Sequence, residues 1–319
     1  MRTEFRVALS IGIVLLGACA NKEPVQKFAT STEELVKSFD SFASRAKATC
    51  QSKYMYMDLD ASGNFDANPE GAKYKAECSD YDQAYTALKV YSNVVSAYAS
   101  SLGKLAGVEN SVFADDIDGV STQISKWKTT GGDKVNADTV SAATKLIKSA
   151  AEAATGIMVD NKIKKELREN HENLVIVVDD MKKFANEIQQ RNLESAKRYA
   201  SVPLEQLIKL SYVPSNENKD DQFTNILASG TESKRTTDAL GARLPYRILQ
   251  AELYKNISLI DQEKVALKSF GDSCDALIKA HRDLRDNYGE LNKEEMLKKI
   301  KEFYDKVKEA RENFIALRS

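Results

Sequence analysis

The chain has 319 residues with a formal charge of −1, and it contains only 5 prolines and 14 glycines. A near-neutral balance without a long basic run argues against nucleic acid as a partner. No proline falls between residues 71 and 202, which argues against a loop-rich or β-sandwich fold and favours helices.

Residues 1–18 have the layout of a secretory signal peptide. Two arginines precede an apolar stretch that is shorter than the ~20 residues of a membrane-spanning helix. The segment Leu16-Gly17-Ala18-Cys19 then resembles the lipobox of bacterial lipoproteins. The resemblance implies that the signal peptide is removed before Cys19 and that Cys19 receives lipid and anchors the chain to a membrane. An ordinary cleaved signal peptide beside a chance cysteine is the alternative.

Residues 19–29 are predicted to be a short tether between this lipid and the folded body. They contain Pro24 and show no sustained apolar period. In the lipoprotein pattern, Ala20 after the cysteine implies sorting to the outer membrane of a bacterium with two membranes. Loss of residues 1–18 removes two arginines and one glutamate, so the formal charge changes from −1 to −2.

Residues 30–319 are predicted to form helices, because apolar side chains recur three or four positions apart. The first helix is expected to begin near Ser31, where Ser31 and Glu34 have the spacing of a capping box, and to end near Cys50. Further helices are predicted over 81–105, 113–127, 137–158 and 163–199. The run LVIVV at 174–178 could be a buried strand, but the heptad spacing that follows it favours a helix.

The last third of the chain has the most regular pattern. From Pro245, a suitable first helical residue, a seam of residues seven apart continues to Tyr288. Asn292 and Glu295 have capping-box spacing before a final helix. An unbroken helix over 245–288 would be ~65 Å long. The predicted fold is therefore all-α, an elongated multi-helix bundle with coiled-coil-like seams, and polar residues 215–221 mark its one plausible subdivision.

Residues 58–70, DLDASGNFDANPE, resemble a calcium loop of the EF-hand kind. Calcium takes about six to eight hard oxygens, and the alternating spacing can bring such ligands together. The candidate ligands are Asp58, Asp60, Ser62, Asn64, Asp66 and Glu70. The twelfth position, where that family has a bidentate glutamate, is Pro69, and Glu70 comes one residue late. An acidic turn that binds no metal is the alternative.

Besides Cys19, the chain contains three cysteines and two histidines. Cys50 and Cys78 flank the acidic loop, and a disulfide between them would stabilise an exported protein by roughly 3 to 4 kcal/mol. Cys274 and His281 share the last apolar seam, so we predict a small buried thiol and a hydrogen-bonded core histidine. His171 has polar neighbours and is predicted to be solvated.

No combination of residues assembles an active site. The tyrosines at 81, 85, 91 and 98 could bind a sugar or peptide, but their helical spacing favours core positions with hydroxyls near the rim. The predicted function is a non-enzymatic helical interaction or scaffold module, anchored to the outer membrane on its periplasmic side and bound to another protein, without a cofactor. A calcium-dependent binding module using residues 58–70 is the alternative. An envelope hydrolase is a third hypothesis, for which we find no nucleophile or metal site.

Overall fold

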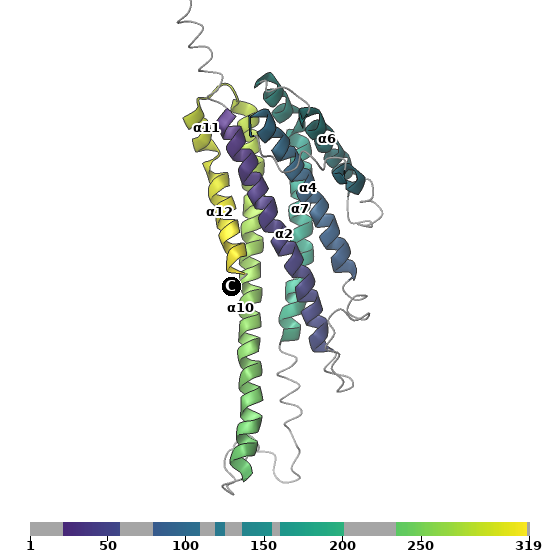
Figure 1. The fold of residues 1–319 in the computed structure, drawn as a ribbon, viewed down its shortest axis with the longest axis vertical. Helices are drawn as coiled ribbons and strands as arrows, with labels where there is room; N and C mark the ends of the chain where they lie inside the picture. Colours follow the sequence, from purple (N-terminus) through teal and green to yellow (C-terminus); the bar gives the residue numbers. More distant parts are fainter. Residues whose placement is uncertain are drawn as a thin grey trace, which may run out of the picture. The chain divides into compact units, whose positions relative to one another are not determined.

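The computed structural model describes residues 22–57, 79–108, 119–124, 136–154, 160–200 and 234–317. The helices with defined ends are α2 (Lys22–Met57), α4 (Ser79–Leu105), α6 (Ala137–Ala154), α7 (Asp160–Ala200), α10 (Lys234–Asn287), α11 (Lys293–Lys299) and α12 (Lys301–Ala316) (Figure 1). Residues 119–124 are also helical, and none of the described residues forms a strand. The prediction of an all-α helical bundle is confirmed.

The chain divides into two compact units. Unit 1 comprises Met1–Lys47, Asp80–Gln189 and Glu263–Ser319, and unit 2 comprises Ala48–Ser79 and Gln190–Gln262. The helices α2, α7 and α10 each contribute residues to both units, and α4 contributes its first residue, Ser79, to unit 2. The predicted subdivision at 215–221 falls outside the described residues.

Unit 1 is built around a continuous apolar core. The helices α2, α4, α6, α7, α10, α11 and α12 all contribute buried side chains to it. Phe39 of α2 stacks on Phe270 of α10, with ring centroids 4.2 Å apart and an interplanar angle of 17°. Phe28 of α2 contacts Phe303 of α12, with centroids 5.5 Å apart. The burial of these large rings explains why the helices pack together as a bundle.

The helices α2 and α4 approach each other closely at Gly103. A Cβ added at this position would lie 3.0 Å from the Cβ of Ala29. Real Cβ atoms rarely come so close, so the glycine makes room for α2.

Three tyrosines of α4 lie in or against the core of unit 1. Tyr91 and Tyr98 are fully enclosed in the core, and Tyr85 packs against it. The predicted core positions are confirmed for these three tyrosines, but the hydroxyl of Tyr98 is buried against His281 and does not lie near the rim. Tyr81 has no described side chain.

The helix α2 begins at Lys22, and the prediction that the first helix begins near Ser31 is wrong. Val25 and Phe28 are 0% and 1% exposed, so apolar burial stabilises a helical segment whose own pattern is short. Pro24 lies in the first turn, where a proline removes no helical hydrogen bond. The tether predicted over 19–29 is therefore wrong from Lys22 onward, and residues 19–21 lie outside the described part of the chain.

The two C-terminal helices of the prediction also differ from the structure. The helix α10 begins at Lys234, so Pro245 is an internal residue and not the first one. Proline has no backbone N–H, so it removes one helical hydrogen bond, while the turns before and after it keep their backbone donors. The predicted final helix is two helices, α11 and α12, which meet at the buried Ile300. The capping box of Asn292 and Glu295 at the start of α11 is confirmed.

Candidate functional site

The two histidines of the chain are buried against each other in unit 1. His171 of α7 and His281 of α10 are 2% and 0% exposed. Their rings are nearly parallel, with an interplanar angle of 13° and centroids 5.2 Å apart, and the two Nδ1 atoms are 3.0 Å apart. At this distance one nitrogen donates and the other accepts, so a single proton lies between the two rings.

Tyr98 of α4 extends the pair to a chain of three side chains. Its hydroxyl oxygen lies 2.8 Å from Nε2 of His281 and 3.3 Å from the backbone carbonyl oxygen of Glu166. In one arrangement Tyr98 donates to His281, which donates to His171. In the other His171 donates to His281, which donates to Tyr98, and the tyrosine donates to the carbonyl. Both arrangements keep the imidazoles neutral and give both nitrogens of His281 a partner.

A second buried polar cluster joins α6 to α7. Glu166 is 6% exposed, and its carboxylate accepts a hydrogen bond from the hydroxyl of Ser149. Nδ2 of Asn170 donates to the same carboxylate at 3.0 Å and to Oγ of Ser149 at 2.7 Å. Burial raises the pKa of Glu166, although the hydrogen bond from Ser149 acts in the opposite direction. These contacts give every member of the cluster a polar partner.

Burial lowers the pKa of both histidines. Desolvation is the largest cause at His281, where it and the nearby His171 and Arg285 lower the pKa to about 3. The pKa of His171 is also lowered, first by burial and then by the guanidinium of Arg285. Burial raises the pKa of Tyr98 well above its usual value. All three side chains are therefore uncharged near neutral pH.

The chain of Tyr98, His281 and His171 has no open face to a solute, because each side chain is at most 2% exposed. Its three members come from α4, α10 and α7, so the hydrogen bonds fix the relative position of three helices. Loss of one partner would leave a buried donor or acceptor unpaired, at a cost of about 1 to 3 kcal/mol. We interpret this cluster as a polar part of the core that specifies how the helices pack.

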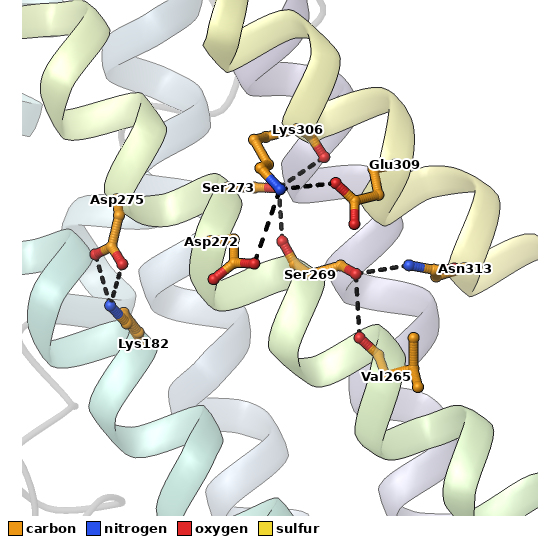
Figure 2. Close-up of polar contacts among 9 residues, drawn as sticks. All are labelled: Lys182, Val265, Ser269, Asp272, Ser273, Asp275, Lys306, Glu309 and Asn313. Atoms are coloured by element: carbon orange, nitrogen blue, oxygen red, sulfur yellow. Dashed lines mark hydrogen bonds and ion pairs between the residues drawn. The ribbon is translucent and has the colours of Figure 1, made fainter.

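A polar seam joins α10 to α12 (Figure 2). Oγ of Ser273 lies 2.9 Å from the backbone carbonyl oxygen of Lys306 and 2.7 Å from that of Ser269, and it can donate to either. Nδ2 of Asn313 donates to Oγ of Ser269 at 2.6 Å. Nζ of Lys306 in α12 lies 3.9 Å from a carboxylate oxygen of Asp272 in α10. Because these bonds need matched positions on both helices, the seam sets the register of α12 along α10.

An exposed stripe runs along α10 within unit 2. Its members are Ile248, Ala251, Tyr254 and Ser258, which are three or four residues apart and all exposed. Ile248 and Tyr254 are 58% and 65% exposed, the two highest values among the large apolar side chains that the structure describes. Helices pack against each other through residues with this spacing. We call these four residues the α10 stripe.

The first turn of α2 is tied to the starts of two other helices. Nζ of Lys22 lies 3.9 Å from a carboxylate oxygen of Asp160, the first residue of α7. The carboxylate of Glu23 forms an ion pair with Lys293, the first residue of α11. The starts of α2, α7 and α11 therefore lie together at one end of unit 1 (Figure 1). We call this the α2 end of unit 1.

Two further contacts add the ends of α4 and α10 to the α2 end. Nε2 of Gln26 donates at 2.7 Å to the backbone carbonyl of Ala106, the residue after α4. The hydroxyl of Tyr288, the residue after α10, donates at 3.3 Å to the carboxylate of Asp160. Between these contacts Val25 is fully buried. The first turn of α2 is thus part of the packed unit.

Most of the residues predicted to carry function lie outside the described residues. These are Cys19, Asp58, Asp60, Ser62, Asn64, Asp66, Glu70 and Cys78. Cys50 lies in α2, but its side chain is not among those described. The lipid anchor, the calcium loop and the Cys50–Cys78 disulfide therefore stay predictions. Among the described side chains, no three histidines, cysteines, aspartates or glutamates are grouped so that they could hold a metal ion.

For the cysteines and histidines whose side chains the structure describes, two predictions are confirmed and one is wrong. Cys274 is a buried free thiol, and His281 is a buried, hydrogen-bonded histidine. His171 is buried and not solvated. The reason is its helical face, because Leu167 and Leu174 lie four residues before it and three after it and both are buried. This apolar spacing is the sequence signal that indicates a buried His171. The polar residues next to His171 in the sequence point the other way and obscure it.

None of the described helices is both long enough and apolar enough to cross a membrane. Comparisons with protein-family models, curated proteins and solved structures gave no match to this chain.

Proposed function

We propose that this chain is a lipid-anchored protein of the bacterial cell envelope, held to the outer membrane on its periplasmic side, and that its helices form a non-enzymatic interaction module for another protein. The lipobox-like segment Leu16-Gly17-Ala18-Cys19 supports the anchor, and Ala20 supports sorting to the outer membrane. The α10 stripe supports the protein partner.

The α10 stripe is the observation that carries the interaction part of the proposal. Tyr254 presents a large exposed ring, and the small side chains of Ala251 and Ser258 lie one turn to either side of it. A partner helix could come close at these small residues while the ring of Tyr254 packs into it, as anchor residues do in interfaces. Exposed Arg247 and Glu252 lie nearby and would form part of a polar rim.

The anchor is tested with the substitution Cys19→Ser. We expect the wild-type chain to incorporate a fatty-acid analogue during growth and the variant to incorporate none, because the thiol that receives lipid is gone. The variant Cys274→Ser is the matched control, since Cys274 is buried in the core and should not affect labelling. Equal labelling of Cys19→Ser and the wild type would show that the anchor lies elsewhere.

The partner site is tested with a photo-crosslinking amino acid at Tyr254 in the full-length chain in growing cells. We expect a discrete adduct that is lost when Ile248 is changed to aspartate, because a charge in the α10 stripe disfavours helix packing. The same amino acid at Ile315 is the matched control, since Ile315 is also an exposed apolar residue but belongs to α12.

Three outcomes separate the hypotheses about the partner. An adduct from Tyr254 that depends on Ile248 supports the interaction module. Equal adducts from Tyr254 and Ile315, or none from Tyr254, would contradict it. An adduct that disappears when calcium is chelated would favour the calcium-dependent binding module instead.

A further inference from the structure

The proposed lipid would be attached very close to the packed part of unit 1. Cys19 precedes Lys22, the first residue of α2, by three positions. Consecutive Cα atoms are about 3.8 Å apart, so the Cα of Cys19 lies within about 11 Å of the Cα of Lys22 whatever conformation the intervening residues adopt. The chain offers no longer connection between the lipid and the bundle unless α2 unwinds.

Unwinding of α2 is opposed by the contacts of its first turns. Val25 is fully buried, and Gln26 is hydrogen-bonded to Ala106. Exposure of a buried valine side chain alone costs about 1.5 to 3 kcal/mol. The ion pair between Glu23 and Lys293 adds a smaller contribution, because both side chains are partly exposed. The attachment point is therefore held at the α2 end of unit 1.

The surface of the α2 end is polar and carries both signs of charge. Lys22 and Lys293 are accompanied by Glu23 and Asp160, and the exposed Asn292 lies beside them in the chain. Packed helices lie about 8 to 10 Å apart, so these groups fall within one or two helix spacings of Lys22. Such a surface can lie among hydrated headgroups, whereas its charges would be costly in the hydrocarbon region.

We infer that the α2 end of unit 1 lies directly against the phospholipid headgroups of the membrane that holds the lipid anchor. This inference rests on the proposed lipidation of Cys19 and adds an orientation to it. The short connection places the α2 end on the membrane surface, and the helices α2 and α7 lead from that end into the aqueous compartment.

The inference is tested by the distance of two positions from the membrane surface. A fluorescent amino acid is placed at Glu294, an exposed residue of α11 at the α2 end, or at Lys183, which is exposed and lies ~34 Å along α7 from Asp160. The lipidated full-length chain is reconstituted in vesicles of phosphatidylethanolamine and phosphatidylglycerol in which some headgroups carry a nitroxide, a short-range quencher. We expect severalfold stronger quenching at Glu294 than at Lys183.

A longer connection serves as the matched control. About 30 glycine and serine residues inserted between Asn21 and Lys22 have an r.m.s. length of about 30 Å, which frees the α2 end from the surface while the lipid stays in place. Quenching at Glu294 should then fall to the level seen at Lys183. Undiminished quenching would overturn the inference, because the short connection would not be its cause.

The same samples distinguish the inference from the proposal on which it rests. Mass spectrometry of the wild-type chain shows whether Cys19 carries lipid. A chain without lipid would overturn the proposed anchor and the orientation together. A lipidated chain with equal quenching at Glu294 and Lys183 would leave the anchor intact and overturn the orientation alone.

Discussion

Replacing Phe28 by alanine is expected to lower the free energy of unfolding of unit 1 by about 3 to 5 kcal/mol. Phe28 is 1% exposed, and its ring contacts Phe303 and the imidazole of His281, with centroids 5.5 and 5.6 Å away. The substitution removes buried apolar surface and leaves a cavity among rings that can close only in part. Urea unfolding followed by circular dichroism measures the loss.

The neighbouring residue Lys27 provides the matched control. Its side chain is exposed, so Lys27→Ala should change the free energy of unfolding by no more than about 0.5 kcal/mol. If the two variants unfolded at the same urea concentration, the start of α2 would not belong to the core. That result would favour the tether predicted from the sequence, and the orientation at the membrane would lose its basis.

Acidification from about pH 7 to about pH 4.5 is expected to lower the free energy of unfolding by about 2 to 3 kcal/mol through His281 alone. In the folded chain its pKa is lowered to about 3, mainly by burial, from an ordinary value of 6.5. The unfolded chain therefore binds a proton on this residue below about pH 6.5, whereas the folded chain does not. The stability that the neutral ring contributes is complete above that pH and is lost as the pH falls toward 3.

The substitution His281→Leu isolates this contribution. At pH 7 the variant should be less stable by about 1 to 3 kcal/mol, because Tyr98 and His171 lose their common partner. As the pH falls, only the wild type loses the contribution of His281, so the difference between the two proteins should shrink. The other charged groups nearby, among them Glu166 and Arg285, are present in both proteins. Their contributions to the pH dependence therefore largely cancel when the free energies of unfolding of the two proteins are subtracted.

The variant Tyr98→Phe is the control for the acid response. It removes the hydroxyl that faces Nε2 of His281 but keeps both imidazoles, so it should lose stability at pH 7 and still respond to acid like the wild type. Parallel stability curves for the wild type and His281→Leu between about pH 7 and about pH 4.5 would contradict the buried neutral state of His281.

The helices of this chain could be predicted because apolar spacing reports which face of a helix is buried. Cys274 and His281 lie seven residues apart on one seam, and the structure buries both. The same rule applies at the start of α2, where Val25, Phe28 and Leu35 mark a buried face, although Pro24 in the sequence favours a break. A proline in a first helical turn is compatible with a helix, so the presence of proline alone was a poor guide.

The contacts between helices could not be predicted in this way. His171 and His281 are 110 residues apart in sequence, and their contact depends on which helices are neighbours and on how each is rotated. The same holds for the ion pair of Glu23 with Lys293, which places the start of α2 beside α11. Periodicity identifies the buried face of each helix, but it does not identify the partner against which that face packs.

The contact of Phe28 with Phe303 also has a consequence for biosynthesis. It joins α2 to α12, so this part of the core can close only after α12 has been synthesised and has left the ribosome. Before that point the rings of α2 lack their final neighbours. For the exported protein that we propose, this order of synthesis would delay stable folding. The new chain would then stay unfolded long enough to be translocated across the inner membrane.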